Sequence, residues 1–269
     1  MIEAFCQSDD SFLHIKKWQQ LHPKLIAGFT TRNGGVSAPP FHTLNFGLHV
    51  PDNQEDVIKN RNILANKLHI PVANWVSGEQ VHQTSIKVVS EEDKGKGSIS
   101  YDSSLKGIDG LITNKKGILC TAFFADCVPI YFFDPVSEYI GIAHAGWKGT
   151  VNGMAEKMVL ALKEKGVQTT NLLAAIGPCI SQEMYEVDER VVSTIDGKYR
   201  EKCIISKGNN RFLLNLKQLN VEILLQSGIL RHNIEVTNYC TFKDDALFFS
   251  HRRDKGKTGR MLGFLGYLA

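Results

Sequence analysis

Residues 117 to 150 decide the fold, and they read GILCTAFFADCVPIYFFDP (117–135) followed by VSEYIGIAHAGWKGT (136–150). Residues 117–125 and 129–133 are almost wholly apolar, which is typical of strands that are covered on both faces. Asp134-Pro135 marks a turn, and residues 138–143 return as a third strand. The stretch therefore predicts three consecutive strands at the centre of a buried β-sheet.

Side chains that can bind a metal interrupt this apolar block where its strands end. Cys127 follows Asp126 between the first two strands, and His144 ends the third. His82 lies upstream, in the segment GEQVHQT (78–84). Burying such polar groups costs free energy unless something binds them. We therefore expect the chemistry of the protein at these strand ends.

Composition limits the class of protein. The chain has 269 residues, of which 43% are hydrophobic and 22% charged, as in an ordinary globular protein. A net charge of +3 with scattered basic residues argues against nucleic acid as a partner. We expect neither a membrane span nor a signal peptide. Six cysteines without CxxC spacing indicate reduced thiols and a cytoplasmic protein.

The remaining patterns predict a mixture of strands and helices. We expect a strand over residues 25–30, a helix over about 53–68 capped by Pro51-Asp52, and an exposed excursion over 91–107. A second helix, capped by Thr150, carries an apolar stripe as far as Leu162. Because the order has no strict βαβ rhythm, we predict an α+β fold with a mixed β-sheet core flanked by helices. We expect residues 1–269 to form a single compact domain.

Residue types alone leave several interpretations of the strand ends open. His82, Cys127 and His144 could bind zinc with a fourth position open. Cys127 and His144 could instead be a nucleophile and its base, or simply a buried cysteine and a hydrogen-bonded core histidine. Multi-copper oxidation requires dense histidine ligation. Nine dispersed histidines with no His-x-His pair argue against it.

Several longer motifs occur in one order along the chain. They are GEQVH (78–82), DGLIT (109–113), ADCVP (125–129), AHAGWKG (143–149), AIGPCI (175–180), CT (240–241), FFSHRRD (248–254) and TGRM (258–261). Together these motifs resemble the laccase-domain (YfiH-like, polyphenol oxidoreductase) family of purine nucleoside phosphorylases, from about residue 24 to the C-terminus. A series of motifs in order is far more specific than any single motif.

This resemblance implies both a metal site and a reaction. It implies zinc at His82, Cys127 and His144, with copper possible in vitro but not favoured. It also implies phosphorolysis of adenosine, inosine or methylthioadenosine, and deamination of adenosine. The family's fold is similar to that of a deamidating toxin with a Cys–His pair. An amide hydrolase that uses Cys127 and His144 in peptidoglycan-precursor editing therefore remains the alternative.

The two nucleoside reactions need further residues. A deaminase requires a proton shuttle, for which Asp126 is the first candidate and Glu79 the second. A phosphorylase must hold phosphate and nucleoside, and guanidinium groups are natural phosphate ligands. The candidate substrate- or phosphate-binding residues are Asn45, Arg61, Gln80, Arg252 and Arg260, with Arg253 also considered. Nothing in the sequence predicts the oligomeric state.

Overall fold

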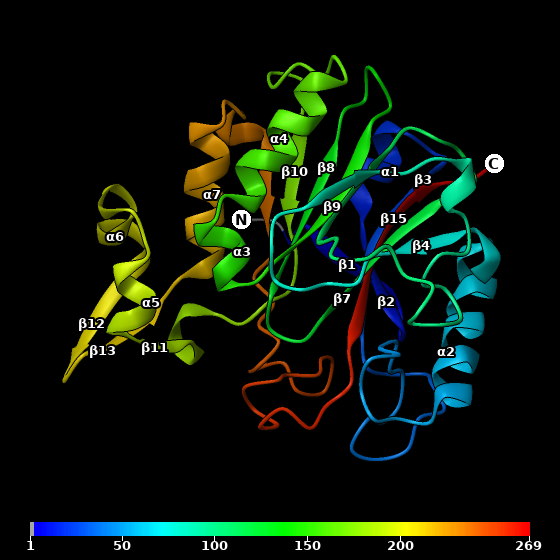
Figure 1. The fold of residues 1–269 in the computed structure, drawn as a ribbon, viewed down its shortest axis with the longest axis horizontal. Helices are drawn as coiled ribbons and strands as arrows, with labels where there is room; N and C mark the ends of the chain where they lie inside the picture. The colour runs from blue at the N-terminus through cyan, green and yellow to red at the C-terminus, as the bar shows by residue number, and fades with distance from the viewer. Residues whose placement is uncertain (1–2) are drawn as a thin grey trace.

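The computed structural model describes residues 3–269 and arranges them around two six-stranded sheets packed face to face (Figure 1). The first sheet has the order β1 (Phe5–Asp9), β2 (Phe12–Ile15), β3 (Leu25–Thr30), β15 (Met261–Tyr267), β7 (Leu119–Phe124), β4 (Trp75–Ser77). The second has the order β14 (Ile234–Val236), β10 (Leu173–Ile176), β8 (Val128–Phe133), β9 (Ile140–Ala145), β6 (Gly110–Thr113), β5 (Ile86–Val88). Both sheets mix parallel and antiparallel pairs.

Helices cover the outer faces of the two sheets. The helix α2 (Gln54–Leu68) packs on the first sheet, and α4 (Met154–Glu164) and α7 (Leu216–Gln226) pack on the second (Figure 1). The shorter helices are α1 (Lys16–Leu21), α3 (Trp147–Val151), α5 (Glu189–Ser193) and α6 (Gly197–Cys203). Single 3-10 turns occur at Val72–Asn74, Glu91–Asp93, Gln182–Met184 and Arg231–Asn233. A three-stranded sheet of β11 (Glu186–Asp188), β13 (Arg211–Leu214) and β12 (Ile204–Gly208) projects from one side (Figure 1).

The strand β7 shows why the central stretch is apolar on both faces. Cys120, Ala122 and Phe124 lie in the core between the two sheets. Leu119 and Phe123 alternate with them and pack in the core under α2. Period-two alternation sends successive side chains to opposite faces. Burial of each large apolar side chain stabilises the fold by about 1.5–3 kcal/mol.

The structure confirms the α+β class and the three predicted central strands, and it corrects two helix starts. The helix α2 is capped by Asn53 rather than Asp52, because the Asn53 side chain accepts from the backbone N–H of Glu55 and of Asp56. Thr150 is not a cap. It lies buried inside α3, and a glycine with φ +83° at position 153 separates α3 from α4.

The prediction of an exposed excursion over residues 91–107 was wrong in part. Asp93, Ser98 and Ser104 are buried, and the Arg61 guanidinium donates to the carbonyl oxygens of Gly97 and Ser98. A polar segment can be buried when its backbone groups are paired in this way. Among residues 3–269, no helix combines the length and apolar character needed to cross a bilayer.

Candidate functional site

The fold brings three segments together at one end of the paired sheets. Cys127 lies where the chain leaves β7 in the first sheet and enters β8 in the second. The antiparallel register of β8 and β9 sets His144 opposite Pro129, two residues beyond Cys127. His82 lies in the connection between β4 and β5. The topology thus explains how side chains 62 positions apart in sequence, 82 and 144, come to share a site.

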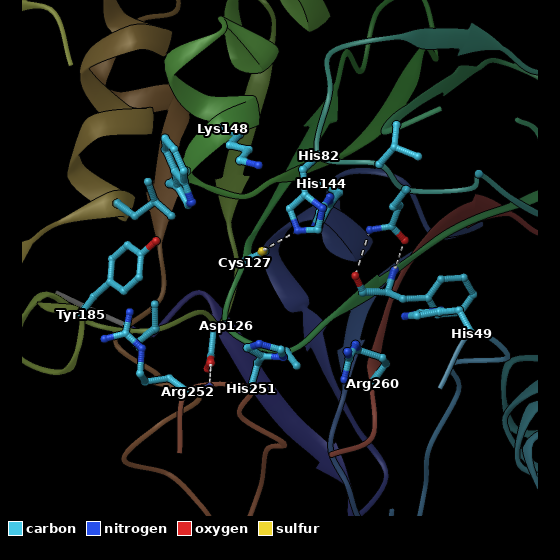
Figure 2. Close-up of a pocket in the computed structure, with 18 of the residues that line it drawn as sticks. His49, His82, Asp126, Cys127, His144, Lys148, Tyr185, His251, Arg252 and Arg260 are labelled. Carbon is cyan, nitrogen blue, oxygen red and sulfur yellow. Dashed lines mark hydrogen bonds between the residues drawn. The ribbon is translucent and has the colours of Figure 1, made fainter. Parts of the chain in front are cut away.

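His82, Cys127 and His144 form a compact group (Figure 2). Their potential ligand atoms all lie within 4.8 Å of one another. The Cys127 Sγ is 3.8 Å from His82 Nε2, and the centroids of the two imidazole rings are 4.7 Å apart. A Cβ at position 146 would lie only 3.0 Å from the Cys127 sulfur, so a residue larger than glycine would crowd this group. One thiolate and two imidazoles are a ligand set that fits zinc.

Asp109 holds two parts of this group at once. Its Oδ1 lies 2.8 Å from His144 Nδ1, so a proton on Nδ1 leaves Nε2 free as a ligand. The same carboxylate accepts from the backbone N–H groups of Val81, His82 and Gln83, at 2.9–3.1 Å. Asp109 belongs to the DGLIT motif (109–113), but it was not among the predicted site residues. Its position at the start of a buried strand was the available signal.

The charges of the group favour a thiolate beside an imidazolium when no metal is bound. Burial would raise the pKa of Cys127, but the charge of His144 and hydrogen bonds from His144 and His82 lower it to about 6. Burial would likewise lower the pKa of His144, but the Cys127 charge and the Asp109 hydrogen bond raise it to about 9. A thiolate at neutral pH is the form that binds metals and attacks electrophiles.

Asp126 supports the rim of the site. Its Oδ1 accepts from Thr241 Oγ1 at 2.7 Å, and its Oδ2 accepts from Ser250 Oγ at 3.0 Å and from the backbone N–H of Arg252 at 2.7 Å. The residue has φ +87°, a left-handed backbone conformation that is unfavourable for any residue other than glycine. The carboxylate thus fastens the 240–252 segment beside Cys127.

A pocket of about 530 Å³ opens beside the three ligand residues (Figure 2). Its lining includes His49, Gln80, Tyr101, Phe123, Trp147, Lys148, Tyr185, His251, Arg252 and Arg260. Four of these residues were not predicted as site residues: Tyr101, Trp147, Lys148 and Tyr185. Trp147 and Lys148 nevertheless belong to the AHAGWKG motif (143–149). The pocket is concave, largely aromatic and cationic, which suits a small polar ligand with a flat ring.

Three of the proposed substrate-binding residues line this pocket. Gln80 is hydrogen-bonded to both the N–H and the carbonyl of Phe123, at 2.7 and 2.9 Å. Arg260 donates to the carbonyl oxygens at positions 258 and 259. Arg252 donates to the carbonyl oxygen of residue 186 and lies over the Tyr185 ring.

The other candidates lie outside the lining. Arg61 is only 1% exposed and donates to the carbonyl oxygens of residues 46, 97 and 98. Asn45 is buried and accepts from the backbone N–H of Arg260 at 2.8 Å. Glu79 faces Lys106, and Arg253 donates to backbone carbonyls and to Asp254. These four side chains are engaged with other parts of the protein rather than with the pocket.

Comparison with known proteins gives a consistent family. The sequence model described as "Multi-copper polyphenol oxidoreductase laccase" matches residues 26–267. The protein named "Purine nucleoside phosphorylase YlmD" from Bacillus subtilis is 42% identical over 268 residues, covering 97% of this chain and 96% of that protein. The protein of the same name from Geobacillus stearothermophilus is 42% identical over 245 residues, covering 90% of this chain and 89% of that one.

Solved structures agree with the sequence relatives. The crystal structure of the Bacillus licheniformis hypothetical protein YfiH superposes with a TM-score of 0.94 and 42% identity, covering 98% of each chain. That of YlmD from Geobacillus stearothermophilus gives a TM-score of 0.94 and 39% identity, covering 99% of this chain and 100% of that one. With a family match across nearly the whole chain and relatives of this identity, the chain belongs to the multi-copper polyphenol oxidoreductase laccase (YfiH-like) family.

Proposed function

We propose that the protein is a zinc-dependent purine nucleoside phosphorylase that acts on adenosine, inosine and methylthioadenosine and also deaminates adenosine. The observation that carries this proposal is the His82–Cys127–His144 group on the floor of a pocket of about 530 Å³. Pockets for small molecules span about 300–1,000 Å³, so a nucleoside fits. The names of the relatives from two organisms, both "Purine nucleoside phosphorylase YlmD", support the substrate class.

We favour zinc over copper on the chemistry and number of the ligands. Oxidation of phenols with oxygen requires several copper centres rich in histidine. Within residues 3–269 a single group of His, Cys, Asp or Glu side chains has its ligand atoms gathered for a metal. Copper could still occupy this group in vitro. Zinc held by His82, Cys127 and His144 would supply Lewis acidity at its open fourth position.

The proposed reactions require positioned groups around that position. In phosphorolysis the bond from ribose C1′ to the base nitrogen breaks and a phosphate oxygen bonds to C1′. The proton of the phosphate leaves with the base, so the products are a free purine and ribose 1-phosphate. In deamination, water replaces the 6-amino group, which leaves as ammonia. Asp109 holds His144 and the His82 loop in place for both.

Phosphate dependence tests the proposal most directly. Purified protein of measured zinc content is incubated with adenosine, with and without phosphate, and adenine is separated from inosine. We expect adenine and ribose 1-phosphate only when phosphate is present, and inosine under both conditions. Adenine formation that ignores phosphate, or no conversion of adenosine, would contradict the proposal.

One observation favours a second candidate, a cysteine-dependent amide hydrolase for peptidoglycan precursors. Cys127, His144 and Asp109 lie in the order of a thiol, an imidazole and an orienting carboxylate. In this reaction the Cys127 thiolate attacks the amide carbonyl, the amine leaves with a proton from His144, and water then cleaves the thioester. Such a mechanism has no need of His82. The close approach of that third ligand is why we rank the hydrolase second.

We also propose a cytoplasmic location with purine nucleosides and phosphate as partners. All six cysteines are free, as expected in a reducing compartment. The small net charge of +3 gives no reason to expect nucleic acid as a partner.

A further inference from the structure

Both ends of the pocket carry cations and aromatic rings, but they differ in how far their cations are already bonded to the protein. Figure 2 shows Lys148, Tyr185 and Arg252 on one side of the His-Cys-His group, with His49 and Arg260 on the other. We propose that inorganic phosphate binds at the first end, between Lys148 and Arg252, and that the purine base binds at the second end, against His49, Tyr101 and Phe123. This inference rests on the proposed phosphorylase function and assigns a direction to the substrates within the site.

The first end carries two cations that no carboxylate neutralises directly. Lys148 is exposed, and its Nζ lies 5.7 Å from the centroid of the Trp147 ring. The Arg252 guanidinium carbon lies 5.1 Å from the Tyr185 ring centroid, and only Nη1 donates to the protein, to the carbonyl of residue 186. Across residues 3–269, neither cation takes part in an ion pair within 4.0 Å. Their free N–H groups are therefore available to a phosphate dianion.

The acids beside this end are already engaged. Asp126 accepts from two hydroxyl groups and from the backbone N–H of Arg252. Glu186, whose carbonyl binds Arg252, turns its carboxylate to Lys207 at 2.8 Å. An anion that enters this end of the pocket thus meets two cations, and the carboxylates beside it are bonded elsewhere.

The second end offers flat rings and a neutral polar edge. The ring centroid of His49 lies 5.8 Å from that of Tyr101 and 6.0 Å from that of Phe123. Aromatic side chains at such spacing provide faces and edges on which a purine can stack. The nitrogens of His49 make no hydrogen bond to the residues that the structure describes, and the residue lines the pocket.

His49 is suited to a neutral base rather than to an anion. Desolvation in the pocket, followed by the charges of Arg260 and Arg61, lowers its pKa to about 4. The imidazole is therefore neutral at pH 7 and presents one donor and one acceptor to a purine edge. The cations at this end are already engaged: Arg260 donates through Nη1 to two backbone carbonyls, and Lys106, 5.6 Å from the Tyr101 ring centroid, lies 3.8 Å from Glu79 Oε1.

This arrangement also satisfies the geometry of the reaction. Displacement at ribose C1′ requires phosphate to approach from the side opposite the departing base. With phosphate at one end and base at the other, C1′ lies between them, beside His82, Cys127 and His144. The C1′–N bond to the base breaks as the C1′–O bond to phosphate forms, and the phosphate proton leaves with the base.

Separate Michaelis constants for phosphate and inosine test the assignment. Lys148→Gln and Arg252→Gln should each raise the KM for phosphate by about tenfold while the KM for inosine stays within about twofold, because a charged hydrogen bond to one substrate is lost. Tyr101→Leu should show the reverse pattern. Lys163→Gln, which changes an exposed lysine of α4, should leave both constants unchanged. Arg252→Lys, which keeps the charge, should recover part of the loss.

A second measurement does not depend on turnover. Inorganic phosphate should raise the thermal midpoint of the wild-type protein and of Lys163→Gln, but not that of the Lys148→Gln/Arg252→Gln double variant. Phosphorolysis by the wild type together with an unchanged phosphate KM in both cationic variants would overturn this inference alone. So would an increase confined to the KM for inosine. A wild type that shows no phosphate-dependent cleavage of any purine nucleoside would instead overturn the proposed function.

Discussion

The floor of the pocket and the scaffold behind its wall use polar side chains in opposite ways. On the floor, His82, Cys127 and His144 keep their ligand atoms within 4.8 Å of one another and turned to a common point. Behind the wall, Arg61 donates to three backbone carbonyl oxygens, and at the rim Asp126 accepts from three donors. Both regions contain a buried polar side chain, His144 and Arg61, yet only the floor leaves atoms for a ligand.

The difference shows what decides the role of a buried polar residue. Burial of a charge is costly without partners, so every such group must be satisfied by the protein or by something that binds it. The hydrogen-bond partners of Arg61 are backbone carbonyl oxygens of the chain itself, so the role of this residue is to stabilise the fold. At the floor, Asp109 binds one nitrogen of His144, and the facing atoms of His82, Cys127 and His144 have only one another as partners among residues 3–269. A metal is the natural partner for what remains.

Removing a floor ligand should have the largest effect. We expect Cys127→Ala and His144→Ala to lose the bound zinc, about one ion per chain in the wild type, and to lower phosphorolysis by more than about 100-fold, because even outer partners of metal ligands cost 10–100-fold. Elemental analysis and nucleoside assays measure both. Cys6→Ala, at another partly buried free thiol, should change neither. Full zinc retention in the two ligand variants would refute the site.

Asp109 should give the next largest effect. Asp109→Asn keeps the shape of the side chain but replaces one carboxylate oxygen by an NH₂ group. In the wild type that oxygen accepts hydrogen bonds, so in the variant a donor would face another donor. We expect zinc affinity and kcat/KM to fall by about 10–100-fold. Competition with a chelator measures the affinity. Asp134→Asn is the matched control, because Asp134 is also buried and accepts from backbone N–H groups, at residues 136 and 137. An equal loss of zinc in the control would show that Asp109→Asn acts by disturbing the fold in general and not by releasing the metal ligands.

The sequence predicted the floor better than the scaffold, for a physical reason. The apolar runs of 117–150 allow little but buried strands, and the strand ends then fix where Cys127 and His144 can lie. Arg61 lies on the buried stripe of α2, and its partners come from positions 46, 97 and 98, which no local pattern connects to it. The strands β1 and β2 were not predicted, since they are only five and four residues long and β1 is only partly buried.

Alkylation of Cys127 distinguishes a zinc ligand from a catalytic nucleophile at this position, and we expect an effect of moderate size. In zinc-free protein, the thiolate fraction should rise with a midpoint near pH 6, because the lowered pKa favours the reactive form above that pH. Iodoacetamide labelling, followed by peptide mass analysis, should show this profile. Reloading zinc should slow labelling at pH 7 by about tenfold or more, since the thiolate is then a ligand. Rapid labelling of zinc-loaded enzyme, with an acyl-Cys127 adduct on an amide substrate, would favour the hydrolase.

Arg61 should show the smallest effect on catalysis and a large one on stability. In Arg61→Met the carbonyl oxygens of residues 46, 97 and 98 lose their donors while remaining buried. Each unsatisfied buried group costs about 1–3 kcal/mol, so we expect the free energy of unfolding in urea to fall by about 3 kcal/mol. The KM for phosphate should change less than about threefold, because the guanidinium does not line the pocket.

The conservative variant makes this last comparison sharper. Arg61→Lys keeps a positive charge, but one ammonium cannot reproduce the planar fork that reaches carbonyl oxygens on two separate segments. A scaffold role therefore predicts that Arg61→Lys is nearly as unstable as Arg61→Met, with phosphate binding retained in both. A ligand role predicts the opposite order, in which lysine keeps much of the phosphate affinity and methionine loses it at little cost in stability. A tenfold rise in the phosphate KM of Arg61→Met, with unchanged urea unfolding, would move Arg61 from the scaffold to the site.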